Sequence, residues 1–218
     1  MGRVVEPYDT DKQINAYGFG ANINPFGNKN VSHCFNLTLT ERECVDRVEG
    51  VLQAYTQAID KIQLYGPTNF ADIINKCAGM AASKTNNQSE QNYVILLMIT
   101  DGVISDMKQT ANAIVDASDL PLSIIIIGVG NADFDAMEEL DADEHPLRHS
   151  NGQRMKRDIV QFVPFNKFKD ADIGRLAKEV LEEVPAQITG YMTMKKLHPL
   201  RQVSKEELNR TGSILSMY

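Results

Sequence analysis

Residues 93–102 read Tyr-Val-Ile-Leu-Leu-Met-Ile-Thr-Asp-Gly, and this stretch decides the fold. No polar residue interrupts the run from Val94 to Ile99, and the run is far too short to be a membrane-spanning helix. A short continuous apolar run is typical of a strand that is buried on both faces of a parallel sheet. Leu122–Val129, with four consecutive isoleucines, predicts a second strand of the same kind.

Helical periodicity surrounds these apolar runs. Residues 107–115 predict a helix between the two strands, which makes the unit a strand, helix, strand crossover in the parallel sense. Helical spacing also covers 70–81, 134–140 and 173–184, and 159–163 reads as a further strand. The sequence therefore predicts an α/β domain built on a doubly wound, mostly parallel sheet with helices on both faces, as in Rossmann-like folds.

The two ends of the chain carry weaker patterns. We expect strands at 14–21 and 31–37, followed by a capping box at Thr40 and Glu43 that starts a helix. The last helix should end before Pro185, because proline is unfavourable inside a helix. From about residue 193 the pattern becomes polar, which predicts a domain over 1–192 and a polar C-terminal tail over 193–218.

Charge and cysteine content narrow the class of protein. The net charge of −7, with basic residues scattered along the chain, argues against nucleic acid or an anionic membrane as a partner of this domain. Three cysteines without a metal-binding spacing predict neither a disulfide framework nor a zinc site. A reducing, cytoplasmic environment is the expectation.

The residues that follow the buried strands are the candidates for a functional site, because ligands of open parallel sheets bind beyond the carboxyl ends of the strands. Asp101 and Gly102 follow the first strand, and Ser105 and Asp106 come just after them. An aspartate here either takes part in a ligand site or caps the next helix, and both interpretations stay open. Thr68 precedes another helix and is either its N-cap or a second oxygen donor for a divalent cation.

Other patterns do not support a specific chemistry. The acidic stretch 133–144 lacks the glycine that an EF-hand requires at its sixth position, since counting from Asp141 that place is Pro146. Gly128-Val129-Gly130 lacks the third glycine of a dinucleotide fingerprint. The four histidines have no spacing that indicates a catalytic triad. A phosphatase of the haloacid dehalogenase type would need an aspartate nucleophile where Ile99 stands.

A set of distinctive blocks runs in one order through the chain. The blocks are Tyr8-Asp9-Thr10-Asp11-Lys12, Gly18-Phe19-Gly20-Ala21, Leu64-Tyr65-Gly66-Pro67-Thr68-Asn69, Leu97-Met98-Ile99-Thr100-Asp101-Gly102-Val103-Ile104-Ser105-Asp106, Gly128-Val129-Gly130-Asn131-Ala132-Asp133-Phe134 and Arg157-Asp158-Ile159-Val160-Gln161-Phe162-Val163-Pro164-Phe165. In these blocks the chain resembles the von Willebrand factor A domain of copines. Plant RING-type ubiquitin ligases contain a closely similar A domain.

The resemblance implies a metal-ion-dependent adhesion site. In that family the site uses an Asp-x-Ser/Thr-x-Ser loop after the first strand, a threonine and an aspartate. Thr68 matches the threonine and Asp101 the aspartate, and the flanking Gly66, Asn69, Gly102 and Ser105 are the expected partner-binding residues. The expected ion is Mg²⁺ or Mn²⁺.

The first metal loop of the family has no counterpart in this sequence, which begins near the end of the family's first helix. We therefore expect metal binding to be weak or absent, because two direct protein ligands are few even for Mg²⁺. The family's first strand lies centrally in the sheet, so its lack would leave unpaired backbone groups and an apolar gap. A swapped segment, the tail of another copy in a homo-oligomer, or an altered strand arrangement are the alternatives for filling it.

The resemblance implies a non-enzymatic protein-interaction module that binds an acidic side chain of a protein partner at the metal site. The parent copine is expected to be cytoplasmic and to reach membranes in a calcium-dependent way, through lipid-binding domains outside this chain. Two alternatives stay open, namely a metal-free structural interaction domain and the A domain of a RING-type ubiquitin ligase.

Overall fold

The computed structural model describes residues 2–24, 30–142, 145–168 and 172–199. The helical elements are α1 (Gly2–Val5), η1 (Glu6–Tyr8), α2 (Arg47–Ile59), α3 (Ala71–Ser83), α4 (Met107–Ala117), α5 (Asp135–Asp141), η2 (Phe165–Lys167), α6 (Ile173–Val180) and α7 (Val184–Met194). The strands are β1 (Gln13–Asn15), β2 (Tyr17–Gly18), β3 (Ala21–Asn22), β4 (Val31–Ser32), β5 (Phe35–Asn36), β6 (Cys44–Asp46), β7 (Gln63–Leu64), β8 (Val94–Thr100), β9 (Leu122–Gly128) and β10 (Val160–Pro164).

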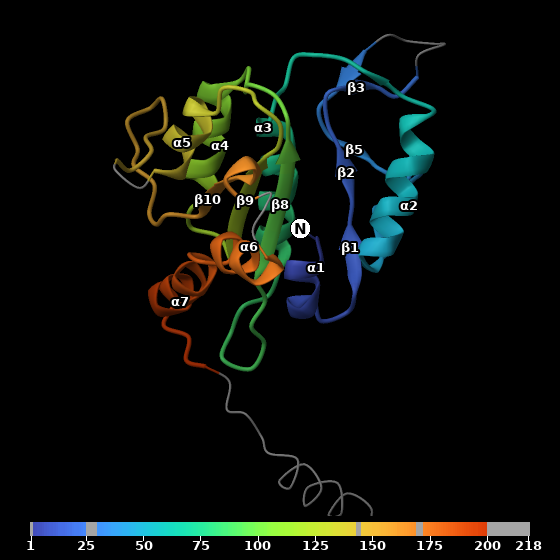
Figure 1. The fold of residues 1–218 in the computed structure, drawn as a ribbon. Coiled ribbons are helices and arrows are strands. Elements are labelled where there is room, and N and C mark those ends of the chain that lie inside the picture. Colours follow the sequence, from blue (N-terminus) through green and yellow to red (C-terminus); the bar gives the residue numbers. More distant parts are fainter. Residues whose placement is uncertain (1, 25–29, 143–144, 169–171, 200–218) are drawn as a thin grey trace, which may run out of the picture.

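A parallel sheet organises the C-terminal part of the fold (Figure 1). Its strand order in the described residues is β10-β9-β8, and both strand pairs are parallel. Every residue of the central strand β9 is buried, which explains why its sequence, apart from Ser123, is apolar without alternation. The predicted α/β class and parallel sheet are confirmed.

Helices cover both faces of this sheet. Ile124 and Ile126 of β9 belong to a core cluster shared with α3, α4 and α5. Ile125 and Ile127 point to the other face and pack with residues of α1, α6 and α7. Burial of one isoleucine side chain contributes about 1.5–3 kcal/mol, so the isoleucine run of β9 is a main source of stability.

The N-terminal part is an antiparallel assembly of short strands. β1 pairs with β6, β2 with β5, and β3 with both β4 and β7. The strands predicted at 14–21 and 31–37 are thus present only as short segments. One interruption lies at Gly20, which has a φ of +65° and turns the chain close to the Tyr65 carbonyl.

The predicted capping box at Thr40 and Glu43 is wrong. Helix α2 begins at Arg47, after strand β6. The Glu43 carboxylate instead accepts hydrogen bonds from Lys76 Nζ at 2.7 Å and from the Tyr17 hydroxyl at 2.9 Å. The hydrogen bond from Lys76 lowers the pKa of Glu43, so this carboxylate stays ionised and connects the antiparallel part to α3.

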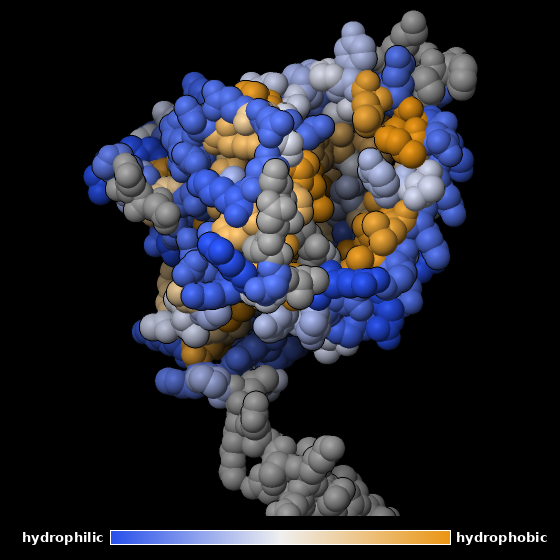
Figure 2. All heavy atoms as spheres, in the orientation of Figure 1, coloured by the Kyte–Doolittle hydropathy of each residue, from blue (hydrophilic) through white to orange (hydrophobic). Residues whose placement is uncertain are grey.

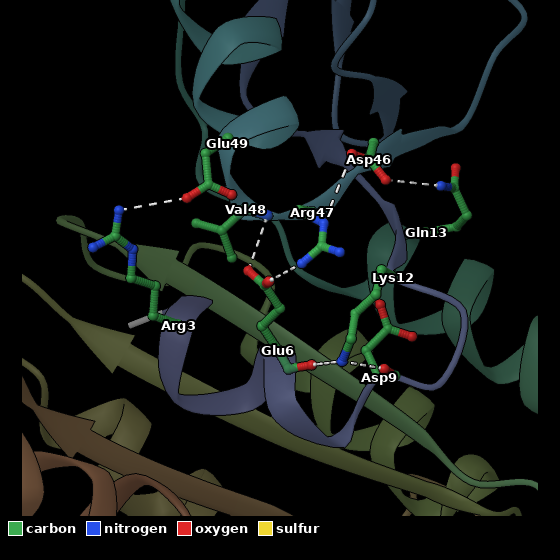
Figure 3. A network of polar contacts seen from close by, with 9 residues as sticks. All are labelled: Arg3, Glu6, Asp9, Lys12, Gln13, Asp46, Arg47, Val48 and Glu49. Carbon is green, nitrogen blue, oxygen red and sulfur yellow. Dashed lines mark hydrogen bonds and ion pairs between the residues drawn. The ribbon is translucent and has the colours of Figure 1, made fainter.

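A polar network joins the N-terminal helical turns to α2 (Figure 3). The Glu6 carboxylate accepts a hydrogen bond from the Val48 backbone N–H at 3.3 Å and forms an ion pair with Arg47 at 3.6 Å. Lys12 Nζ donates to the backbone carbonyl of Glu6 at 2.6 Å. Because Val4 of α1 packs in the same cluster as β9, these contacts tie the antiparallel part to the parallel sheet.

The single C-terminal helix predicted over 173–184 is wrong, because α6 ends at Val180 and a separate helix, α7, begins at Val184. Two helices follow one another, and Pro185 lies in the first turn of α7 instead of beyond a helix end. Proline fits a first helical turn, because the N–H that it lacks would have no partner within the helix. Residues 200–218 lie outside the described residues, so the boundary between domain and tail stays a prediction. No helix in the described ranges is long and apolar enough to cross a membrane.

The central place of β9 makes a prediction about stability. Ile126→Ala should lower the free energy of unfolding by about 3 kcal/mol, because it leaves a cavity among fully buried side chains. Ile99→Ala is the matched control in β8, where the side chain is half exposed and the expected loss is below about 1 kcal/mol. Urea unfolding measures both values, and equal losses would contradict the placement of β9 at the centre and β8 at the edge.

Candidate functional site

Two loops lie against each other at the carboxyl end of β8. One loop precedes α3 and contains Thr68, and the other follows β8 and contains Ser105. The Ser105 backbone N–H donates to the Thr68 carbonyl at 2.8 Å, and the Thr68 N–H donates to Ser105 Oγ at 3.2 Å. This reciprocal pair aligns segments that are 37 residues apart in the sequence.

Gly102 lies beside the Thr68 hydroxyl. A Cβ atom at position 102 would be 3.2 Å from Thr68 Oγ1, so a larger residue would crowd this oxygen. Gly66 has open space around it, and Asn69 is half-buried in the same loop as Thr68. The structure therefore brings Thr68, Gly102 and Ser105 together and places Gly66 and Asn69 beside them in sequence. Their role in partner binding stays a prediction.

Asp101 is exposed at the end of β8, next to Gly102. Its carboxylate forms no hydrogen bond or ion pair within the described part of the chain. Of the two roles that the sequence left open, the cap of the following helix is not seen for Asp101, because the α4 N-terminus holds no side-chain cap. An exposed carboxylate beside the Thr68 loop remains available to a cation.

Asp106 has a structural role that the sequence did not reveal. Its buried carboxylate accepts hydrogen bonds from the backbone N–H groups of Phe70 at 2.9 Å and Ala71 at 3.0 Å, and from the Thr110 hydroxyl at 3.0 Å. Asp106 thus caps the N-terminus of α3, the helix after the Thr68 loop, and not the helix that follows it in sequence. Together with the hydrogen bonds between Thr68 and Ser105, this side chain holds the two loops of the candidate site in position.

The side-chain oxygens of the two loops are of the chemical type that binds a hard divalent cation. Thr68 Oγ1, Ser105 Oγ and the Asp101 carboxylate are oxygen donors of the type that Mg²⁺ prefers. Only one of the three is charged, and no group of three or more His, Cys, Asp or Glu that could hold a metal occurs among the described residues. This donor set fits an ion that keeps several of its water ligands, as Mg²⁺ does, and not an ion that needs a complete protein cage.

A separate hollow of about 720 Å³ lies between the segment around His33 and helix α3. Cys34 and Lys76 are among its lining residues. Burial raises the pKa of the Cys34 thiol, and it raises that of the adjacent buried Cys77 to about 11. Both thiols are therefore protonated at neutral pH, and neither is an activated nucleophile.

Comparison with protein families gives the class of the chain. A family model described as Copine matches residues 1–200, a range that includes the parallel sheet and both loops of the candidate site. The chain belongs to the copine family. This match confirms the resemblance seen in the sequence blocks. It also supports a general role of the copine domain in protein interaction, without indicating the partner. The metal site and the nature of the parent protein, copine or RING-type ligase, stay predictions.

The different settings of the two aspartates predict different effects on stability. Asp106→Ala should lower the free energy of unfolding by about 3 kcal/mol, because it leaves two buried backbone N–H groups and the Thr110 hydroxyl without their acceptor. Asp101→Ala should change it by less than about 0.5 kcal/mol, because that side chain is exposed. Urea unfolding of the two variants compares these values. A large loss for Asp101→Ala would mean that this residue is structural.

Proposed function

We propose that this copine domain is a non-enzymatic module that binds a protein partner at the crevice between the Thr68 and Asp101 loops, with Mg²⁺ or Mn²⁺ at the contact. The observation that supports the proposal most is the reciprocal hydrogen bonding of Thr68 and Ser105. It holds the Thr68 hydroxyl beside Gly102, and the residue before Gly102 is the exposed Asp101. Such preorganised oxygens lower the entropy that ligand binding would otherwise cost.

Each residue has a distinct part in the proposed site. Asp101 contributes the negative charge, Thr68 contributes a neutral oxygen, and Ser105 holds the Thr68 loop in place. Gly102 leaves the space above the Thr68 hydroxyl free of side-chain atoms. When bound, a divalent cation supplies positive charge and open coordination positions for a carboxylate of the partner.

Charge explains why a partner with an acidic side chain would need the ion. The chain has a net charge of −7, and the candidate site contains an exposed carboxylate. Direct approach of an acidic group to Asp101 would place like charges together, which disfavours the complex. A cation between them reverses the sign of this interaction, so the proposed partner binding is metal-dependent.

The cellular location that we propose for the domain is inferred from its membership of the copine family. In the parent copine we place it in the cytoplasm, and calcium-dependent membrane recruitment belongs to lipid-binding domains outside this chain. The acidic net charge of the chain fits a module that contacts a protein and not nucleic acid or an anionic lipid surface.

A metal-free interaction domain is the second candidate function. It is favoured by the single carboxylate of the donor set and by the lack of a three-residue metal-binding group in the described ranges. In that case the same loops would bind a partner through hydrogen bonds and apolar contacts alone.

Thermal unfolding with and without metal tests the proposal. With only two direct protein ligands the expected affinity is weak, so Mg²⁺ or Mn²⁺ is titrated to high concentration. A saturating ion should then raise the Tm of the domain, because a ligand that binds only the folded state stabilises it, by about 1.4 kcal/mol at ten times its Kd. The rise should disappear in Asp101→Ala and in Thr68→Ala. Glu139→Ala, which removes an exposed carboxylate of α5, is the matched control and should retain the rise.

A rise that persists in Asp101→Ala would show that the ion binds elsewhere. The absence of any rise in the unmodified chain would favour the metal-free interaction domain.

A further inference from the structure

Two arginines stand directly opposite each other in the segment before β10. Arg148 and Arg154 form an antiparallel bridge within a tight turn over residues 147–155, called the arginine turn below. The backbone hydrogen bonds of this turn join the residues before and after each arginine, at 2.8 Å and 3.1 Å. The arginines are therefore a non-hydrogen-bonded pair, in which the side chains lie on one face with Cβ atoms about 4.5–5.5 Å apart.

Neither arginine has a counter-ion. Both side chains are exposed, and neither forms a hydrogen bond or an ion pair within the part of the chain that the structure describes. Like charges directly opposite each other destabilise a pair of extended segments. The chain therefore holds two positive charges together at a cost in stability, although its net charge is −7. Local conflicts of this kind are expected at functional sites.

Contacts with α4 and with the core hold the arginine turn in place. The Asn112 side chain donates to the Ser150 hydroxyl at 3.1 Å and accepts from the Ser150 N–H at 2.8 Å. Leu147 is buried, and Met155 packs against the core cluster on the α4 side of the sheet. Gly152 has a φ of +90°, which lets the chain reverse there. The arginine pair is therefore carried by a fixed backbone, which lowers the entropy cost of binding a ligand.

The arginine turn lies on a polar side of the molecule. In Figure 1 it belongs to the gold chain beside α4 and α5, on the side away from β1 and α2, and Figure 2 shows mostly hydrophilic surface on this side. The turn contacts α4 at Asn112 and near the C-terminal end of that helix, where His149 Nε2 lies 3.8 Å from the Asp116 carboxylate. The Asp101 loop lies before the N-terminal end of α4, so the arginine pair is separate from the proposed metal site.

We propose that Arg148 and Arg154 together bind a phosphoryl group on a segment of a protein partner. The guanidinium group presents its N–H donors in a planar fork that matches the oxygens of a phosphoryl group. A phosphorylated side chain carries a charge of about −1.5 to −2 at neutral pH, which matches the two positive charges of the pair. A carboxylate carries a single negative charge and would neutralise only half of the pair.

A phosphorylated protein segment is a better ligand for the pair than an anionic membrane or a nucleic acid. Lipid surfaces and phosphate backbones are bound by larger basic patches, of about four to eight Lys or Arg residues in the case of lipids. The next cation along the chain, Lys156, is already paired with Asp119 at 2.8 Å. Helix α5, on the same side, carries the exposed carboxylates of Glu138 and Glu139. An extended anionic surface would approach these carboxylates, whereas a single phosphoryl group needs only the two arginines.

Fluorescence polarisation with a defined peptide tests the proposal. The probe is fluorescein-Gly-Ala-Ala-phosphoserine-Ala-Ala-Gly-amide, and its two controls have serine or glutamate in place of phosphoserine. The unmodified chain should bind the phosphorylated probe, bind the glutamate peptide about tenfold more weakly or less, and not bind the serine peptide. All titrations contain EDTA, so the metal site proposed at Asp101 does not contribute. Absence of saturable binding, or equal binding of the three peptides, would overturn the proposal.

Variants of the two arginines locate the binding. Arg148→Gln and Arg154→Gln should each weaken binding of the phosphorylated probe by about tenfold or more, because each removes charge-assisted hydrogen bonds. Arg148→Lys keeps the charge without the planar fork and should bind with intermediate affinity. Arg42→Gln is the matched control, because Arg42 is also exposed and its side chain has no partner in the described ranges. This control should bind the probe normally, and an equal loss in it would show that binding is not specific to the arginine pair.

Thermal unfolding separates binding from a structural role of the arginines. Without peptide, Arg148→Gln and Arg154→Gln should leave the Tm unchanged or raise it, because each removes a repulsion between like charges. A clear fall in Tm would assign the arginines to stability and contradict the proposal. Binding of phosphatidylserine-containing vesicles without binding of the probe would contradict it too, since the ligand would then be a lipid surface. A dimer that dissociates in Arg154→Gln would identify a second copy of the chain as the ligand instead.

Discussion

The burial of β9 on both faces is the constraint on which the rest of the structure depends. Its side chains alternate between two core clusters, one closed by α3, α4 and α5 and the other by α1, α6 and α7. Neither cluster could form without the strand between them, and the strand could not be buried without both groups of helices. Parallel pairing with β8 and β10 follows, because the crossover helices lie on the faces of the sheet.

This arrangement gathers the candidate site at one end of β8. The loop after β8 and the loop before α3 meet there, and Asp106 links them through its bonds to the α3 N-terminus. A buried carboxylate with three donors restricts the backbone on both sides of it. The exposed Asp101 and the Thr68 hydroxyl therefore occupy a rigid frame, which is the general condition for a binding site that needs defined geometry.

The sequence by itself determined the α/β class, the strands β8, β9 and β10 and the copine family, because continuous apolar runs, helical periodicity and family motifs are local patterns. It also selected the loops of Thr68 and Asp101, since residues after buried strands of a parallel sheet gather at one edge. Only the tertiary structure decided that Asp106 caps α3, which lies 36 residues earlier in the chain, and that Glu43 binds Lys76. Partners of polar side chains depend on which segments packing brings together, and spacing along the chain does not encode that.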